Sequence, residues 1–491
     1  MRILKMIIEC AAPLHCGGGT DDVLDQPVNR DAYGFWRIPG SSLAGALRSL
    51  AAAMDEDMAN RLFGEQKKEE SHASLVWCED GLLLDFDGRV ALHKLLRSQN
   101  VAEIRIGSYC AMNFVRDHVC LDLDSGTGAE GGKFDAEIVP PGARFLLEFR
   151  LDGWNREPEK SESDFFDSLC ALVLAGKLNL GGKSGLGYGE YRVVKAEYAE
   201  LNLSESSGME AWLKLESGAD FPAEARKLPL PVPEKGEPGQ NLDGWLEIPL
   251  LCDGPILIGG GNISQSGGEH GADMLFALTP RLVYDSANGQ KGALTWEPII
   301  PASSMRGVTR HALYRVLQAR GCASTRAEEI LREFFGYANE NGAKRGKLVF
   351  TDCPLGKDRQ KRHFQFVQHV ALDRFSAGTL AGALFSEEPF WQKGAEVLCR
   401  IRANNLRAAE AALLFHALLD LCAGETPVGG GVNRGNGRLV LAGWNTDPQK
   451  AMASLAGDIS WRGEPLCADG ACLGQLRKFS AEWDSALREL A

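Results

Sequence analysis

The sequence of 491 residues lacks several features that would place it in a class at once. No apolar run approaches the ~20 residues that a membrane-spanning helix needs, so we expect no contact with a membrane. Its 53 lysines and arginines are outnumbered by 66 aspartates and glutamates, which gives a net charge of −13. This balance argues against a protein that coats nucleic acid through its overall charge, but it is compatible with a local basic groove.

Other signatures are also missing. The 13 cysteines form no paired C-x-x-C motifs, which excludes a structural zinc site of that kind. The N-terminal residues 1–9 carry charge within their apolar stretch and predict a first strand, not a secretory signal. We therefore expect reduced thiols and a cytoplasmic protein. The glycine clusters complete no Walker A motif, and they follow a helix and enter a strand, which is the reverse of the Rossmann order.

What the sequence does contain is one segment written twice. Residues 38–48 (IPGSSLAGALR) return as residues 300–310 (IPASSMRGVTR), at a constant offset of 262 (300 − 38 and 310 − 48). Four further elements recur in the same order, namely residues 14–19 and 257–261, 62–64 and 334–336, 74–80 and 347–352, and 181–189 and 429–437. Five elements repeated in one order indicate a duplicated domain.

The repeat predicts the domain boundaries. We place a first domain at residues 1–200 and a second at 244–445, with a linker at 201–243 because its prolines cannot continue a helix or a central strand. Residues 446–491 form a C-terminal appendage with no counterpart. The order strand–helix–strand–insertion–helix–strand in each half predicts an α+β fold with two tandem ferredoxin-like domains. Their long insertions have the length of functional or disordered loops.

The repeated boxes have the chemistry of a phosphate site. Gly17 and Gly18 permit a close approach of the backbone to a ligand, and Ser41 and Ser42 bring hydroxyls to an expected helix N-terminus. Arg48 lies about two turns further along that helix. The alternative is that the glycines make turns and that Ser41 or Ser42 caps the helix. Recurrence in two otherwise divergent domains favours binding.

At these boxes the chain resembles the RAMP superfamily of CRISPR-associated proteins, and more narrowly the backbone subunits of type III effector complexes. The matching segments are residues 14–18, 25–31 and 38–48 and the closing glycine loops. Residues 115–119 and 370–374 resemble the start of that family's thumb hairpin. The doubled order is similar to the tandem fusions of two backbone subunits in type III-D-like systems.

The resemblance implies two RRM-like RAMP domains with thumb-type insertions that hold a guide RNA and kink the guide–target duplex. It further implies that a flipped-out target nucleotide is cut beside an aspartate, which Asp25 matches by motif position. Attack by the 2′-hydroxyl needs in-line geometry and charge relief, which a kink and Mg²⁺ or Mn²⁺ held by Asp25 would supply. Spacing alone favours a turn aspartate that bonds its own backbone, and the resemblance to the family motif reverses that preference for Asp25.

The same resemblance predicts the RNA-contacting residues. In the first domain these are His15, Gly17, Gly18, Arg30, Ser41, Ser42, Arg48, Lys183 and Ser184. In the second domain they are Gly260, Ser303, Ser304, Arg306, Arg310, Asn433 and Arg434. His15 is a candidate general base, or else a hydrogen-bonded histidine at a strand end.

The second domain departs from the family pattern. Aligning Pro280 with Pro27 places Leu278, which is not an acid, at the position of Asp25. Asp273 lies seven residues before Pro280 and is a secondary catalytic candidate only if the loop is rebuilt. We therefore expect the second domain to bind RNA but to cleave it poorly or not at all.

The sequence thus predicts a metal-dependent endoribonuclease, a backbone subunit that binds guide RNA and cleaves the paired single-stranded target RNA. Other type III effector subunits, including the polymerase-like large subunit, are the expected partners. One alternative is a scaffold of the same complex without catalysis. Another is the superfamily's guide-processing nuclease, which works without metal through histidine chemistry and would depend on His15.

Overall fold

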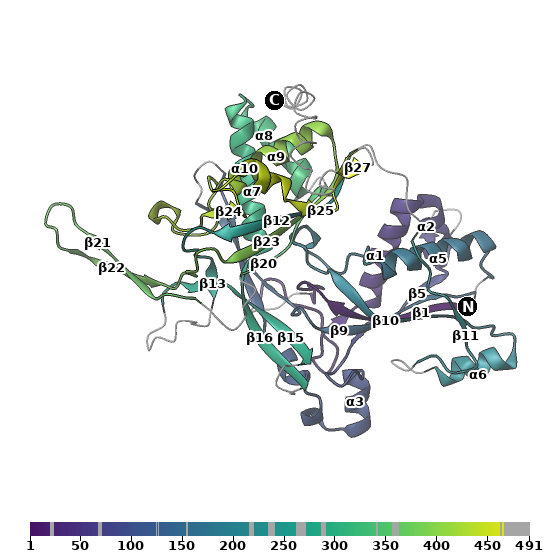
Figure 1. The fold of residues 1–491 in the computed structure, drawn as a ribbon. Coiled ribbons are helices and arrows are strands. Elements are labelled where there is room, and N and C mark those ends of the chain that lie inside the picture. Colours follow the sequence, from purple (N-terminus) through teal and green to yellow (C-terminus); the bar gives the residue numbers. More distant parts are fainter. Residues whose placement is uncertain are drawn as a thin grey trace.

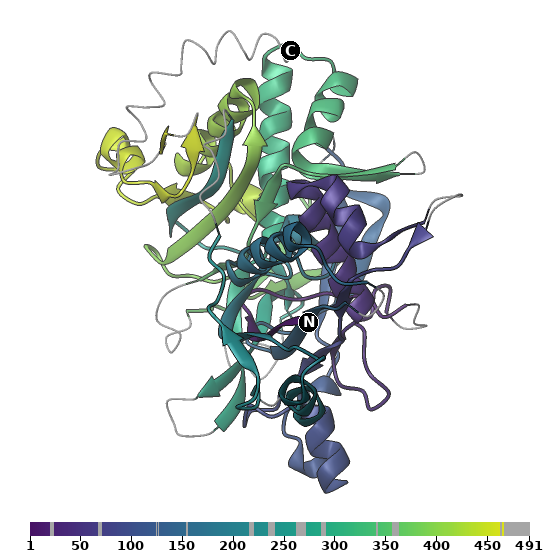
Figure 2. The ribbon, with the colours of Figure 1, turned by 90° about the vertical axis from the view of Figure 1, so that its right-hand side faces the viewer.

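The computed structural model describes residues 1–19, 24–66, 71–123, 125, 127–153, 156–215, 220–233, 241–261, 272–285, 291–339, 342–355, 363–461 and 464–465. In this part of the chain, two α+β domains lie against each other (Figure 1). In the side view of Figure 2 the green and yellow second domain rises above the purple and blue first domain. Among the described residues, no helix combines the length and apolar composition needed to cross a bilayer.

The first domain is built on one antiparallel sheet in the order β11-β10-β1-β9-β6-β2, with β5 also paired to β9. These strands are β1 (Arg2–Cys10), β2 (Arg37–Ile38), β5 (Val76–Cys78), β6 (Gly81–Leu83), β9 (Arg144–Leu151), β10 (Tyr191–Glu200) and β11 (Arg226–Leu228). The helices that pack with the sheet are α1 (Gly40–Met54), α2 (Glu56–Phe63), α3 (Ala91–Ser98) and α5 (Lys160–Leu174). Apolar residues at helical spacing, such as Leu43 and Leu47 of α1, bury one face of each helix.

The second domain repeats this plan in a sheet of order β19-β23-β12-β26-β27, with β24 and β25 also paired to β12. These strands are β12 (Leu242–Cys252), β19 (Leu348–Phe350), β23 (Glu396–Leu406), β24 (Leu439–Leu441), β25 (Ala456–Gly457), β26 (Ser460–Trp461) and β27 (Glu464–Pro465). Its main helices are α7 (Ala302–Ala319), α8 (Ser324–Phe335) and α9 (Ala408–Cys422). The predicted α+β fold with two related domains is confirmed.

Each predicted insertion contains a long two-stranded hairpin that projects from its domain. The first thumb hairpin pairs β7 (Val115–Leu121) with β8 (Gly128–Glu137). The second pairs β21 (Val367–Leu372) with β22 (Thr379–Glu387) and extends to the left in Figure 1. The second thumb therefore begins three residues earlier than the sequence match at Val370 indicated.

The domain edges differ from the predicted boundaries. Strand β11 and helix α6 (Ser206–Lys214), which the sequence assigned to the linker, pack onto the first domain, where Ala211 is buried with Ile3. The described start of the predicted appendage belongs to the second domain, because β25 and β26 pair with β12 and Trp461 enters its core. Residues 234–240 of the linker and 466–491 of the appendage lie outside the described residues.

A hairpin of the second domain packs against the first domain. Strands β15 (Leu278–Asp285) and β16 (Lys291–Ile300) reach onto the first domain, where Leu282 and Tyr284 are buried in its core. The Leu282 N–H donates to the carbonyl of Pro141 at 2.8 Å. The Tyr284 hydroxyl donates to the carbonyl of Leu84 at 3.1 Å. The two domains therefore share one apolar interface.

Candidate nucleic-acid interface

Asp25 lies exposed at the base of the first thumb hairpin. Its N–H donates to Oδ1 of Asp135 on β8 at 2.9 Å, and the Asp135 N–H donates to Oδ2 of Asp25 at 3.0 Å. Next to this pair, the Glu137 N–H donates to the carbonyl of Gln26 at 2.9 Å. The Asp25 carboxylate is therefore fixed to the thumb. This contact with a distant strand differs from that of a turn aspartate, which bonds its own backbone.

Asp273 has the same surroundings in the second domain. Its N–H donates to Oγ of Ser386 on β22 at 3.0 Å, and the Ser386 N–H donates to Oδ2 of Asp273 at 2.7 Å. The Glu388 N–H donates to the carbonyl of Met274 at 3.0 Å, as Glu137 does to Gln26. Hydrogen bonds from the Ser386 backbone and side chain lower the pKa of Asp273. It is an exposed, ionised carboxylate at the thumb base.

The strand register shows that Asp273 is the counterpart of Asp25. Asp25 comes three residues before Val28, which bridges to Gly17, and Asp273 comes three residues before Phe276, which pairs with Gly259. The offset between the two aspartates is 248 (273 − 25), whereas the offset between the serine boxes is 262. The second domain thus carries 14 additional residues (262 − 248) between these two elements.

Those residues lengthen one hairpin. In the first domain, Arg30 bridges directly to Trp36 across a short turn. In the second domain the corresponding pair opens the β15–β16 hairpin, in which Leu278 pairs with Pro298 and Pro280 with Trp296. The alignment of Pro280 with Pro27 is therefore wrong, and Leu278 does not stand at the position of Asp25. The expectation that the second domain lacks an equivalent acid loses its basis.

The Asp25 site offers few ligands for a cation. The residues that the structure describes contain no group of three or more His, Cys, Asp or Glu side chains that could hold a metal ion. At the first thumb, the carboxylates of Asp25 and Asp135 each use one oxygen for the other residue's N–H. The remaining oxygens fit Mg²⁺ or Mn²⁺ that keeps most of its water. At the second thumb, Ser386 replaces the second carboxylate.

His15 is a buried strand-end residue. Its Nδ1 lies 2.8 Å from the carbonyl of Glu137, and its own carbonyl accepts the Gly182 N–H at 2.8 Å. Burial lowers the pKa of His15, so the ring is neutral at pH 7. These contacts favour the hydrogen-bonded structural histidine over a solvent-facing general base.

The closing glycine loops are residues 181–189 and 429–437. A cationic side chain from each loop lies over an aromatic ring of the thumb. Lys183 Nζ is 4.8 Å from the ring of Phe134, and the Arg434 guanidinium is 5.5 Å from that of Phe385. Arg434 also pairs with Glu387 at 2.6 Å. Lys183 and Arg434, two of the predicted RNA contacts, therefore lie beside the two thumbs. Ser184 and Asn433 lie in the same loops.

Sequence reasoning missed a histidine on each thumb. The rings of His118 and Phe134 stack at 4.9 Å, as do those of His369 and Phe385. Burial and then Lys183 lower the pKa of His118 to about 4. An offset of 251 (369 − 118) relates the two thumbs, and a search at that spacing would have found the pair.

The serine boxes differ from the expected helix caps. Helix α1 begins at Gly40 after Pro39, and no side chain of that N-cap residue bonds the helix. Instead, Oδ1 of Asp80 accepts the Gly40 N–H at 2.7 Å. A carboxylate thus occupies the place where the helix N-terminus would bind phosphate. Ser41 and Ser42 are exposed beside it.

The predicted arginines have different environments. The Arg30 guanidinium is held by Glu137 and by the carbonyls of Cys110 and Gly34, so it clamps the loop after Asp25. Arg48 is exposed and donates to Asn60 at 2.9 Å. These contacts leave Arg48, but not Arg30, accessible to RNA in the first domain.

In the second domain the serine box lies next to the first domain. Arg306 donates to the carbonyl of Phe335 at 2.6 Å, and burial lowers its pKa. Its guanidinium closely approaches Gly185 of the first domain. Ser303, Ser304 and Arg310 are half-buried on the same helix, α7.

The predicted glycines fall into two groups. A Cβ on Gly18 would lie 2.6 Å from the carbonyl oxygen of Val28, so this position requires glycine for a close backbone approach. Gly17 and Gly260 are exposed and have open space around them. Gly260, in β13 (Gly259–Gly261), has a φ of 123°. Of the three glycines predicted to contact RNA, Gly17 and Gly260 therefore leave open space beside the backbone, and Gly18 does not.

Comparisons with known proteins identify the family of the chain. The chain is similar to the CRISPR system Cms endoribonuclease Csm3 of Methanocaldococcus jannaschii, with 26% identity over 243 residues, which cover 44% of this chain and 92% of that protein. Among solved structures, a chain of the apo-state type III-B Cmr-beta structure matches 39% of this chain and 97% of its own length, at 18% identity and a TM-score of 0.28. The RAMP superfamily model matches residues 7–192 and again residues 251–440. The chain therefore belongs to the RAMP superfamily, with one match in each of its two domains.

Proposed function

We propose that this chain is a backbone subunit of a type III CRISPR effector complex that holds guide RNA and cleaves the paired target RNA. Cleavage takes place at two positions, beside Asp25 and beside Asp273. The proposal rests on one observation that recurs in both domains. Each aspartate and a residue of its thumb strand exchange hydrogen bonds, in which the backbone N–H of one donates to a side-chain oxygen of the other. Similarity to a protein named as an endoribonuclease supports the reaction class.

The fixed thumb base suits in-line attack. A hairpin that displaces one target nucleotide aligns its 2′-hydroxyl with the next phosphate, and most of the barrier reduction then comes from orientation. Each aspartate is tied to the hairpin that does this, so its carboxylate keeps its place relative to the bent linkage. When bound at this carboxylate, Mg²⁺ or Mn²⁺ would neutralise charge that develops on the phosphate.

Guide binding is local, because the chain as a whole is acidic. Lys183 and Arg434 present cations beside the thumbs, and Ser41, Ser42 and Arg48 present exposed donors along α1. Contacts of this kind hold the RNA backbone without reading its sequence, and base pairing to the guide selects the target. The other effector subunits, among them the polymerase-like large subunit, complete the complex in the cytoplasm.

Cleavage of an end-labelled target by the reconstituted complex tests this function. We expect two cuts, of which Asp25→Ala removes one and Asp273→Ala removes the other, while the double variant removes both. Chelation with EDTA should stop both cuts. Asp420→Ala, which changes an exposed carboxylate on α9, is the matched control and should leave both cuts unchanged.

Two outcomes would favour the alternatives. A complex that binds target tightly but does not cut it, whichever divalent cation is added, is the non-catalytic scaffold. Metal-free cleavage of repeat RNA by the isolated chain, abolished by His15→Ala, would indicate the guide-processing nuclease. The burial of His15 counts against that activity.

A further inference from the structure

One arginine of the first domain binds side chains of the second domain. The Arg116 guanidinium, on β7 of the first thumb, pairs with Oδ2 of Asp352 at 2.7 Å and donates to Oγ1 of Thr279 at 2.6 Å. On its own side it donates to the Tyr188 hydroxyl at 3.3 Å. The Arg116 and Asp352 side chains are only 11% and 13% exposed. This ion pair is therefore largely shielded from water.

Asp352 also holds the start of α7. Its Oδ1 accepts the Ala302 N–H at 2.9 Å, as Asp80 does for Gly40 at the start of α1. The two aspartates are thus equivalent residues of the repeat. In each aspartate, one carboxylate oxygen accepts the N–H of the first helical residue, and the other oxygen pairs with an arginine.

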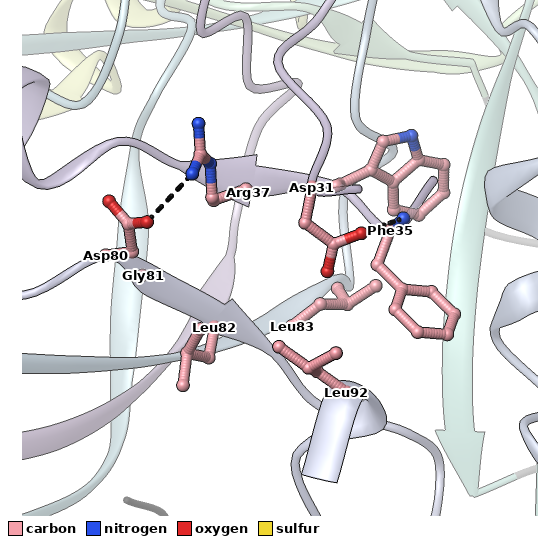
Figure 3. Close-up of a pocket in the computed structure, with 9 residues that line it drawn as sticks. Asp31, Phe35, Arg37, Asp80, Gly81, Leu82, Leu83 and Leu92 are labelled. Atoms are coloured by element: carbon pink, nitrogen blue, oxygen red, sulfur yellow. Dashed lines mark hydrogen bonds and ion pairs between the residues drawn. The ribbon is translucent and has the colours of Figure 1, made fainter. Parts of the chain in front are cut away.

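The source of that cation differs between the domains. In the first domain Arg37 pairs with Oδ2 of Asp80 at 3.0 Å (Figure 3). The offset of 262 places Ile299, which is 2% exposed, at the position of Arg37 in the second domain. Among the described residues, no arginine of the second domain therefore takes the role of Arg37, and Arg116 of the first domain pairs with Asp352.

The location of Arg116 links this contact to both candidate cleavage sites. Arg116 lies in the same hairpin as Asp135, which is bonded to Asp25. Thr279 lies at the start of β15, shortly after the segment that carries Asp273. The guanidinium thus joins the first thumb to the strand that follows Asp273.

The rest of the described interface combines aromatic packing with hydrogen bonds to backbone carbonyls, such as those that Leu282 and Tyr284 donate. The ring of Tyr284 packs on Phe86 at 5.0 Å, and that of Trp296 packs on Phe114 at 6.0 Å. Apolar contacts hold surfaces together but tolerate small shifts, whereas a guanidinium with three fixed partners specifies one arrangement.

We propose that Arg116 is a positioning residue that sets the distance between the two cleavage sites, because it supplies the counter-charge that Asp352 lacks within its own domain. The consequence for cleavage rests on the proposed function, whereas the effect on domain placement does not. Without Arg116 the domains stay together through the β15–β16 hairpin but lose their single relative position.

The distance between the domains tests this directly, without RNA. Spin labels go on Met54→Cys at the end of α1 and Glu329→Cys on α8, which are exposed positions on one helix of each domain. Serine replaces Cys120, which is exposed, and Cys467 and Cys472, so that these thiols do not react. We expect one narrow distance in the parent chain and a broad distribution in Arg116→Met.

Two further variants separate positioning from general damage. Asp352→Asn keeps an oxygen for the α7 N–H but removes the charge, so we expect the same broadening even if Arg116→Met folds poorly. Arg37→Met breaks the corresponding pair within the first domain and is the matched control, which should keep the narrow distance. Unchanged distances in Arg116→Met and Asp352→Asn would overturn the proposal, as would equal broadening in Arg37→Met.

The assembled complex gives a second readout. With the parent chain the two cuts should fall at one fixed separation, and with Asp352→Asn the separation should spread over neighbouring linkages while both cuts persist. A fixed separation in Asp352→Asn would refute the positioning of the sites. A complex that never cuts would refute the proposed function only, because the label distances would still decide the role of Arg116.

Discussion

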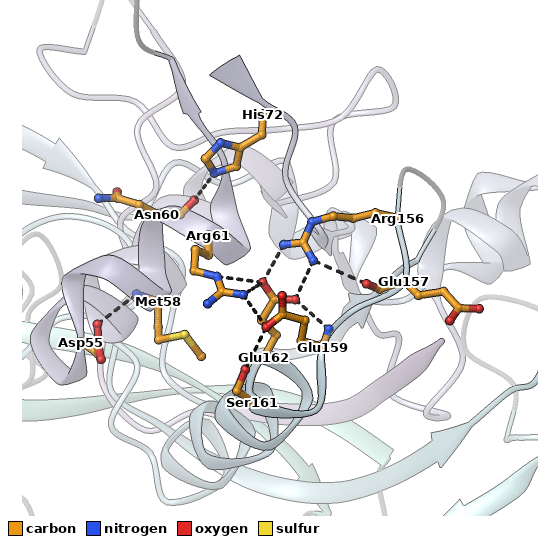
Figure 4. Close-up of polar contacts among 10 residues, drawn as sticks. All are labelled: Asp55, Met58, Asn60, Arg61, His72, Arg156, Glu157, Glu159, Ser161 and Glu162. Atoms are coloured by element: carbon orange, nitrogen blue, oxygen red, sulfur yellow. Dashed lines mark hydrogen bonds and ion pairs between the residues drawn. The ribbon is translucent and has the colours of Figure 1, made fainter. Parts of the chain in front are cut away.

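Replacing Glu162 with glutamine should destabilise the first domain at neutral pH and much less in acid. Glu162 is fully buried in the first turn of α5, where its carboxylate accepts two hydrogen bonds from Arg156, at 2.8 and 2.6 Å (Figure 4). It also accepts the N–H of Glu159 at 2.9 Å and pairs with Arg61 of α2 at 3.0 Å. This cluster joins the start of α5 to the helix that follows the serine box.

The magnitude follows from the ionisation of this one group. The hydrogen bonds from Arg156 are the main reason why the pKa of Glu162 falls from 4.5 to about 2. A difference of this size corresponds to roughly 3 kcal/mol of stability. Both arginines are about two-fifths exposed, at 41% and 42%, so water weakens the interaction. We therefore expect Glu162→Gln to lower the free energy of unfolding by about 2 kcal/mol at pH 7.

The pH dependence has a definite sign. Because the folded chain holds the lower pKa, the stabilisation is fully present above about pH 4.5 and is lost as the pH falls towards 2. Urea unfolding of the parent chain and of Glu162→Gln at pH 7 and pH 3 measures the difference. We expect it to shrink by more than half at pH 3.

The neighbouring Glu159 provides the control. It pairs with the same Arg61 at 2.8 Å but is 62% exposed, so Glu159→Gln should cost at most about 0.5 kcal/mol at either pH. Equal losses for the two variants, or a Glu162→Gln loss that is the same at pH 3 as at pH 7, would refute the assignment of the stability to the buried carboxylate.

Three further predictions concern the interface and the thumb. Gly142→Ala should lower the midpoint of thermal unfolding by several degrees, because its Cβ would overlap the Leu282 carbonyl at a φ of 88°, whereas Gly88→Ala, at a φ of 83° in open space, should cost clearly less. Lys183→Ala should weaken guide-RNA binding and reduce the slope of log affinity against log salt by about one. Titration at several salt concentrations measures this slope, and an unchanged slope would exclude a phosphate contact. The parent chain should lose stability as the pH falls from about 6.5 to 4, because burial lowers the pKa of His118, and His118→Phe should weaken this dependence in pH-resolved urea melts.

The two thumb sites differ in one respect that bears on their chemistry. The first has Asp135 opposite Asp25, and the second has Ser386 opposite Asp273. Two carboxylates attract a cation more strongly than a carboxylate and a hydroxyl. If both sites cut, the cut beside Asp273 should therefore need the higher concentration of Mg²⁺.

Local patterns in the sequence predicted the repeated parts of this protein well. The doubled boxes identified two related domains, since a duplicated chain keeps the residues that its turns and core require. The aliphatic run that ends in Asp80 and again in Asp352 was found without any structure, although its role in binding the start of a helix was not. The resemblance singled out Asp25, and the structure shows that it lies at the base of the thumb.

Tertiary structure alone decided which residues correspond and which partners they have. The 14 additional residues of the β15–β16 hairpin shift the numbering between Asp273 and the serine box, and only strand pairing shows where they belong. The sequence did not show that Arg30, a predicted RNA contact, binds Glu137, or that Arg116 pairs with an aspartate of the other domain. A sequence specifies local geometry within a few residues, whereas an ion pair joins groups hundreds of residues apart, and its partner is known only once the chain has folded.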